Sequence, residues 1–142
     1  MDLSELYHKV ILQHNESPFH YAKMETASHL VEAYNPLCGD RFKLYLDVED
    51  NRVKQAHFHG YGCAISKAST SILLQKIEGK TLQEIPDIIQ QFYAYVHPDK
   101  DPSGVTHDPD FEAFAAAKKF PVLLKCATLS WDELETDLKK WS

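Results

Sequence analysis

The feature that most constrains this chain is the segment Asn35-Pro36-Leu37-Cys38-Gly39-Asp40. Pro36 restricts the backbone, and Gly39 reaches backbone angles that are closed to other residues, so the segment predicts a tight turn. Such a turn can direct the thiol of Cys38 and the carboxylate of Asp40 toward one point. The segment therefore predicts half of a metal site, and the fold has to supply the remaining ligands.

Two further cysteines are available to complete this site. Cys63 follows Gly60-Tyr61-Gly62, where glycines give way to a helical pattern, and Cys126 lies in the last helical segment. The chain has three cysteines in total. Three thiolates and one carboxylate make a full tetrahedral set for zinc, so we expect Cys38, Asp40, Cys63 and Cys126 to bind Zn²⁺.

Two other interpretations of these residues are open. A free cysteine is often simply a small buried apolar residue. Against this, Cys38 and Cys63 lie beside glycines, and a helix start at Cys63 would stabilise a thiolate. His57 and His59 alternate on one predicted strand face and are a second pair of candidate ligands, although such pairs more often form a solvated or hydrogen-bonded face.

Composition narrows the class of protein. A chain of 142 residues with 44% hydrophobic content predicts one domain with one core. The net charge of −6 disfavours nucleic acid as the main partner. The chain begins without a signal segment and has no apolar run long enough to span a bilayer, so we expect a cytoplasmic protein with reduced cysteines and no membrane partner.

Hydrophobic periodicity predicts an α+β fold, with a small three-stranded antiparallel sheet packed against about five helices in a single domain over residues 1–142. Capping-box pairs predict helix starts at Thr81 with Glu84, and at Ser130 with Glu133 inside the last helix. The predicted strands cover residues 29–34, 42–48 and 52–59, and the predicted helices cover residues 3–14, 64–78, 81–93, a short segment around 111–114, and 124–141.

An insert at about residues 95–118 begins with an acidic, proline-rich part, residues 95–110, which predicts a mobile loop that contributes little to the core. Its aspartates lack the glycine and the closing glutamate of a calcium-binding loop, so a solvated acidic loop is the better interpretation. The serines after Cys63 are not in a GxSxG nucleophile motif.

Three motifs together resemble the IscU/NifU-N family of iron–sulfur cluster assembly proteins, and specifically its SufU branch. They are Asn35-Pro36-x-Cys38-Gly39-Asp40, Gly60-x-Gly62-Cys63-x-Ile65-Ser66, and Lys125-Cys126-Ala127-Thr128. Scaffold members of the family usually have histidine before the last cysteine, whereas SufU-like members have lysine, as Lys125 is here. The chain departs from the SufU pattern at Leu123, where arginine is usual.

The resemblance implies a zinc-bearing protein that accepts persulfide sulfur from a pyridoxal-phosphate cysteine desulfurase of the SufS kind. We expect Cys38 to be the acceptor, because its place on a glycine-flanked turn makes it the most mobile of the ligands. At most this is a zinc-dependent sulfurtransferase that acts as co-substrate of the desulfurase, and downstream cluster-assembly proteins are further partners. Two alternatives remain: a scaffold on which an iron–sulfur cluster is transiently assembled at the same four residues, and a structural zinc module that binds a partner.

Overall fold

The structure is a computed structural model that describes residues 3–141, and side chains from His8 to Trp141. None of the helices in this part combines the length and the apolar character needed to span a lipid bilayer. The main elements follow in the order α1 (Leu3–Glu16), β1 (His29–Asn35), β2 (Asp40–Glu49), β3 (Arg52–Tyr61), α2 (Ala64–Ile77), α3 (Ile85–Val96), α4 (Pro109–Glu112) and α5 (Pro121–Trp141), with short 3-10 turns at Pro102–Gly104 and Ala115–Lys118.

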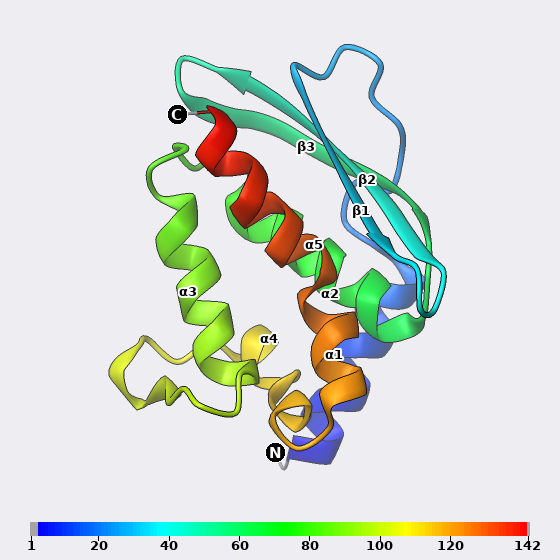
Figure 1. Cartoon of the computed structure of the whole chain (residues 1–142), viewed down its shortest axis with the longest axis vertical. Coiled ribbons are helices and arrows are strands. Elements are labelled where there is room, and N and C mark those ends of the chain that lie inside the picture. The colour runs from blue at the N-terminus through cyan, green and yellow to red at the C-terminus, as the bar shows by residue number, and fades with distance from the viewer. Residues whose placement is uncertain (1–2, 142) are drawn as a thin grey trace.

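The three strands form one antiparallel sheet in the order β1-β2-β3, as predicted (Figure 1). Alternation in the sequence identified the buried face correctly, because Phe42, Leu44 and Leu46 are completely buried while Lys43 between them is exposed. A hairpin joins β1 to β2, and Asn35 pairs with Asp40 across its end. The predicted cysteine turn is therefore the tip of this hairpin.

Helices α2 and α5 lie together against the buried face of the sheet, with α1 and α3 outside them (Figure 1). Small residues on α2 let α5 come close enough for polar contacts inside the core. The hydroxyl of Ser69 donates to the carbonyl of Ala127 at 2.5 Å and accepts from Nε1 of Trp131 at 2.8 Å. These bonds fix the position of α5, which presents Cys126 one residue before Ala127.

The predicted restart of the last helix at Ser130 is wrong, because α5 is one uninterrupted helix from Pro121 to Trp141. Ser130 is buried, and its hydroxyl lies 2.7 Å from the hydroxyl of Thr70 on α2. A helical serine that bonds to a neighbouring helix does not act as a cap. The capping-box pattern here coincides with an interhelical contact.

The predicted start of α3 is also wrong, although the capping box itself is present. The backbone N–H of Thr81 donates to the carboxylate of Glu84 at 3.0 Å, and the N–H of Glu84 donates to the hydroxyl of Thr81 at 3.3 Å. The helix nevertheless begins at Ile85. Leu82 is held instead by a 3.0 Å backbone bond from its N–H to the carbonyl of Asn51 on the β2–β3 hairpin.

The insert is less detached from the core than its composition predicts. Tyr95 and Val96 belong to the last turn of α3 and are buried, so the prediction that residues 95–110 contribute little to the core is wrong at that end. At the other end, the ammonium of Lys76 on α2 lies 2.8 Å from the carboxylate of Asp108 and 3.3 Å from that of Asp110. Only the stretch between these two anchors is largely exposed.

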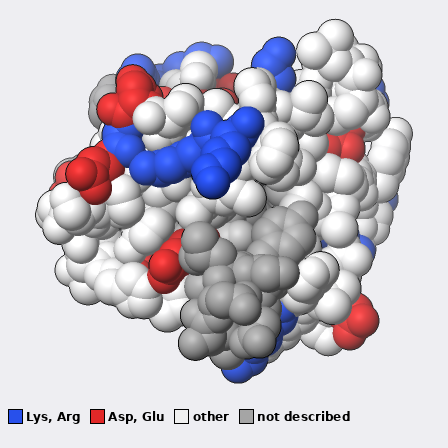
Figure 2. Space-filling model, turned by 90° about the horizontal axis from the view of Figure 1, so that it is seen from below, with Lys and Arg blue, Asp and Glu red and all other residues white. Residues whose placement is uncertain are grey.

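Charged side chains do not form a single-sign surface on the face seen in Figure 2. This face shows a small group of Lys and Arg side chains next to acidic ones, and most of it is uncharged. It lies at the end of the molecule where the loops of the insert and the start of α5 are found.

Candidate metal centre

The turn between β1 and β2 has the geometry expected from its sequence. Gly39 has a φ angle of +78°, which favours glycine, and its N–H donates to the carbonyl of Asn35 at 2.8 Å. The side-chain Oδ1 of Asn35 accepts from the N–H of Leu37 at 3.0 Å. These bonds close the turn and leave Cys38 exposed at its tip.

Asp40 is the first residue of β2 and is buried, with 4% of its surface exposed. Its Oδ1 accepts a hydrogen bond from the backbone N–H of Cys63 at 3.1 Å, and its Oδ2 lies 3.7 Å from the Sγ of Cys63. A buried carboxylate requires compensating partners, and one backbone N–H is a small share of what two oxygens can accept. The remaining capacity faces the thiols.

Cys63 is the N-cap of α2, and its Sγ accepts from the backbone N–H of Ser66 at 3.4 Å. The hydroxyl of Ser66 lies 3.5 Å from the same sulfur and donates to the carbonyl of Cys63 at 3.1 Å. These contacts hold the sulfur of Cys63 at the first turn of α2. Ser66 was not among the predicted site residues, although it occupies the N3 position, three residues after the cap.

Gly62 allows these groups to come together. A Cβ atom at this position would lie 2.7 Å from the Oγ of Ser66, 2.9 Å from the Cζ of Phe42 and 3.0 Å from the Cγ of Asp40. Any larger residue would therefore push Asp40 or Ser66 away from Cys63. The glycine before Cys63 is required by close packing at the centre.

Cys126 approaches from the second turn of α5 and is half-buried. Burial raises the pKa of its thiol to about 12, and a hydrogen bond with Cys63 and the charges of Cys63, Asp40 and Cys38 act in the same direction. Crowded thiolates and a carboxylate repel one another, and a divalent cation at their centre offsets this repulsion. The donor set therefore fits a metal ion.

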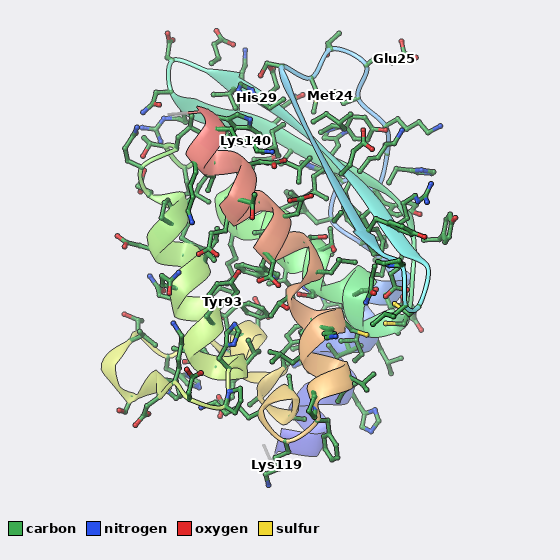
Figure 3. All side chains as sticks on the ribbon, in the orientation of Figure 1. Met24, Glu25, His29, Tyr93, Lys119 and Lys140 are labelled. Atoms are coloured by element: carbon green, nitrogen blue, oxygen red, sulfur yellow. The ribbon has the colours of Figure 1, made fainter. Side chains whose placement is uncertain are left out.

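Three of the four predicted ligands form a close group: one ligand atom each from Asp40, Cys63 and Cys126 lies within 4.8 Å of the others. A tetrahedral zinc ion needs ligand atoms about 3.5 Å apart, so the group has to contract slightly around the ion. Figure 3 shows sulfur atoms gathered where the β1–β2 turn meets the start of α2 and α5. Within the described residues Cys38 is not part of the close group, but it lines a cavity together with Cys126.

The histidine pair lies apart from this group. His59 pairs with Lys43 and is exposed, while the ring of His57 lies 5.0 Å from that of His20. Neither belongs to the three-ligand group found among the described residues. The aspartates of the insert also have other partners: Asp101 accepts from the N–H of Ser103, and Asp108 accepts from the N–H groups at the start of α4.

A cavity of about 300 Å³ opens beside the thiols, between the hairpin turn and the start of α5. We call it the thiol cavity. It was not predicted, because the sequence alone does not show that α5 begins beside the hairpin. It is lined by Asn35, Leu37, Cys38, Pro121, Val122, Lys125 and Cys126.

The family described as NifU-like N terminal domain matches residues 6–121. The zinc-dependent sulfurtransferase SufU of Bacillus subtilis (strain 168) is 34% identical over 139 residues, which cover 98% of this chain and 93% of that protein. The iron–sulfur cluster assembly scaffold protein IscU of Thermotoga maritima is 34% identical over 137 residues, covering 96% and 95% of the two chains.

Solved structures agree with the fold. SufU of Fervidobacterium islandicum AW-1 superposes with a TM-score of 0.78 at 29% identity, covering 94% of this chain and 97% of that one. The N-terminal NifU-like protein of Brucella abortus has a TM-score of 0.80 over 99% of this chain and 100% of the other, at 16% identity, which supports the fold alone. The α+β architecture with a three-stranded sheet is thus shared.

Proposed function

Because the chain belongs to the NifU-like N-terminal domain family, we propose that it acts in iron–sulfur cluster assembly, and more specifically that it is a zinc-dependent sulfurtransferase. The sulfur donor is a pyridoxal-phosphate cysteine desulfurase, and Cys38 is the acceptor. The observation that supports this most directly is an exposed thiol on a hairpin tip next to a close group of three candidate ligands: the buried Asp40, the exposed Cys63 and the half-buried Cys126.

The ligand set of this proposal is Cys38, Asp40, Cys63 and Cys126. When bound, Zn²⁺ would lower the pKa of its cysteine ligands, so that Cys38 is a thiolate at neutral pH. Cys38 is the ligand best placed to leave. It lies on a turn flanked by Gly39 and outside the close group, whereas Cys63 and Cys126 are held on α2 and α5.

The chemistry is a thiol–disulfide type of exchange. The Cys38 thiolate attacks the terminal sulfur of the donor persulfide, the S–S bond of the donor breaks, and the donor cysteine leaves as a thiolate. Cys38 then carries the persulfide. One S–S bond forms and one breaks, so the transfer requires no external oxidant or reductant.

Incubation with desulfurase and cysteine tests this function. Zinc-loaded protein should accelerate turnover of the desulfurase and gain one sulfur atom on Cys38, as detected by mass spectrometry of peptides. Cys38→Ser is the matched control and should do neither. Persulfide found only on Cys63 or Cys126, or no acceleration by the native chain, would refute the assignment.

A scaffold role is the second candidate, because the identity to the IscU scaffold of Thermotoga maritima equals the identity to SufU, at 34%. Three thiolates and a carboxylate can also ligate an iron–sulfur cluster. Protein prepared without oxygen separates the two roles. A sulfurtransferase should be colourless and contain zinc, whereas a scaffold should be brown and contain iron and sulfide. A purely structural zinc module would neither accelerate the desulfurase nor accept sulfur.

A further inference from the structure

The thiol cavity has features of a small-molecule site that the proposed sulfur transfer from a protein donor does not explain. Its volume of about 300 Å³ lies at the lower end of the range for small-ligand pockets. Both Cys38 and Cys126 line it, so a bound molecule would lie against the reactive sulfur. Leu37 and Val122, whose side chains are 81% and 75% exposed, form apolar walls at its rim.

Two residues of the cavity lining, Asn35 and Lys125, have side chains that can donate hydrogen bonds to a ligand. The Oδ1 of Asn35 accepts from the N–H of Leu37, and its side-chain Nδ2 can donate to a ligand. Lys125 is the cationic residue in the lining. No carboxylate is among the described residues that line the cavity. A ligand with an anionic acceptor therefore matches the cavity better than a cationic one.

We propose that the thiol cavity binds a low-molecular-weight thiol bearing a carboxylate, and that this thiol takes the sulfur from Cys38. The carboxylate bonds to Lys125 and Asn35, and the carbon skeleton packs on Leu37, Pro121 and Val122. The thiol of the ligand then points to Cys38. This inference rests on the proposed function, because Cys38 must first hold a persulfide.

The step balances without another reactant. The ligand thiolate attacks the terminal sulfur of the Cys38 persulfide, the S–S bond at Cys38 breaks, and Cys38 leaves as a thiolate. The products are a small-molecule persulfide and regenerated Cys38. Sulfur would thereby leave the protein in a diffusible form, in addition to any transfer to a protein acceptor.

The test compares N-acetylcysteine with its amide, which differ in one negative charge and share the same thiol. Zinc-loaded protein is first persulfidated at Cys38 by desulfurase and cysteine, and the rate of sulfur loss from Cys38 is then followed by mass spectrometry. We expect the acid to discharge Cys38 roughly five- to tenfold faster than the amide at equal thiolate concentration, with saturation of the rate. A short persulfidated peptide provides the intrinsic rate ratio of the two thiols.

Variants locate the effect. Lys125→Gln should abolish the preference for the acid, because it removes the ammonium while keeping a side chain of similar length. Lys54→Gln is the matched control, since Lys54 is an exposed lysine of β3 that does not line the cavity, and it should retain the preference. S-methyl N-acetylcysteine, which cannot react, should inhibit discharge competitively in the native chain.

The outcomes are separable from those of the proposed function. If the desulfurase does not load Cys38, the proposed function fails, and inorganic polysulfide can load Cys38 so that the cavity is still tested. Each of three results would overturn the inference. They are equal discharge rates for acid and amide after correction for their intrinsic rate ratio, a preference for the acid that Lys125→Gln leaves unchanged, and no inhibition by the S-methyl analogue. If the S-methyl analogue does not inhibit discharge while the desulfurase still loads Cys38, the cavity would instead bind a segment of a partner protein.

Discussion

The carboxylate of Asp40 and the thiol of Cys63 lie 3.7 Å apart across 23 residues of sequence, and the same carboxylate accepts the backbone N–H of Cys63 at 3.1 Å. Asp40 thus joins the start of β2 to the start of α2 before any metal binds. One residue serves both as a structural partner of the helix cap and as a candidate metal ligand. Substitutions of Asp40 can separate these two roles.

Replacing Asp40 tests the fourth ligand. We expect Asp40→Ala to weaken zinc affinity by more than about tenfold, since loss of even an outer partner of a ligand costs that much, and to lower the melting temperature because the N–H of Cys63 loses its acceptor. Asp40→Asn keeps an acceptor for that N–H and removes the charge, so it should restore part of the stability but not the zinc affinity. Competition with a chromogenic chelator measures the affinity.

The histidines are the control for that experiment. His57→Ala and His59→Ala should leave zinc affinity within about twofold, because neither belongs to the three-ligand group. If Asp40→Ala keeps full zinc affinity and either histidine variant loses much of it, the fourth ligand is a histidine of β3 and not Asp40.

Replacing the exposed Cys38 should abolish persulfide formation without changing the stability of the fold. In zinc-free protein, Cys38→Ser should change the free energy of unfolding by less than about 0.5 kcal/mol, because the side chain is exposed on a turn. Persulfide formation should be lost completely. Denaturant unfolding checks the stability, and peptide mass spectrometry checks the loss of persulfide. A Cys38→Ser protein that unfolds at a much lower denaturant concentration would contradict the predicted stability.

The packing around Gly62 predicts that Gly62→Ala destabilises the protein by about 1–3 kcal/mol and weakens zinc binding, because the new methyl group overlaps Ser66, Phe42 and Asp40. Gly104→Ala is the matched control, since a Cβ atom there meets no other atom within 4 Å. Chemical denaturation with and without chelator compares them. Equal stability of the two variants would show that Asp40 and Ser66 shift without cost.

Limited proteolysis should cut the insert first, at the exposed Lys100 between its anchors. Lys76→Met removes the ion pairs to Asp108 and Asp110, so it should speed this cleavage several-fold. Trypsin digestion followed by mass spectrometry identifies the first cut. An earlier cut within α3 or α5 would contradict the arrangement described above.

The buried His14 predicts a pH dependence of stability. Burial lowers its pKa below the ordinary 6.5, Lys76 acts in the same direction, and Asp110 opposes both. Below pH 6.5 the unfolded chain binds a proton that the folded chain excludes, so the stability contributed at higher pH is lost as the pH falls. The hydroxyl of Ser71, 2.7 Å from Nδ1, is bonded to a neutral ring.

His14→Gln should therefore lose less stability than the native chain between about pH 7.5 and pH 5.5, whatever its stability at neutral pH. Denaturant unfolding across this range gives the slope for both proteins. Parallel curves for the two proteins would mean that the pKa of His14 does not differ between the folded and unfolded chains.

Much of the fold, and the residues whose ligand atoms the structure brings close together, could be predicted from the sequence because local signals decided them. Alternation at Phe42 and Leu44 identified β2, and glycines beside Cys38 and Cys63 marked the two turns. Errors arose where tertiary contacts override local patterns. The capping box at Thr81 forms but does not start the helix, because Leu82 is bonded to Asn51 of the hairpin, and Ser130 bonds to Thr70 on another helix.

The thiol cavity illustrates a second limit. Asn35 and Lys125 are 90 positions apart, and nothing in either local sequence indicates that they share a surface. Their proximity depends on α5, which is positioned by the bonds of Ser69 to Ala127 and Trp131. The cavity thus depends on packing throughout the core, and no short sequence motif predicts it.

The three close ligands come from β2, α2 and α5, which contact one another only in the folded chain. A bound ion is therefore a reversible cross-link between the sheet and two helices, comparable in topology to a disulfide that closes long loops. Its free energy of binding adds to the free energy of unfolding in proportion to the logarithm of free zinc concentration. The thermal transition of this protein would then report the zinc supply of its surroundings, rising as the ion becomes available and falling when a chelator competes for it.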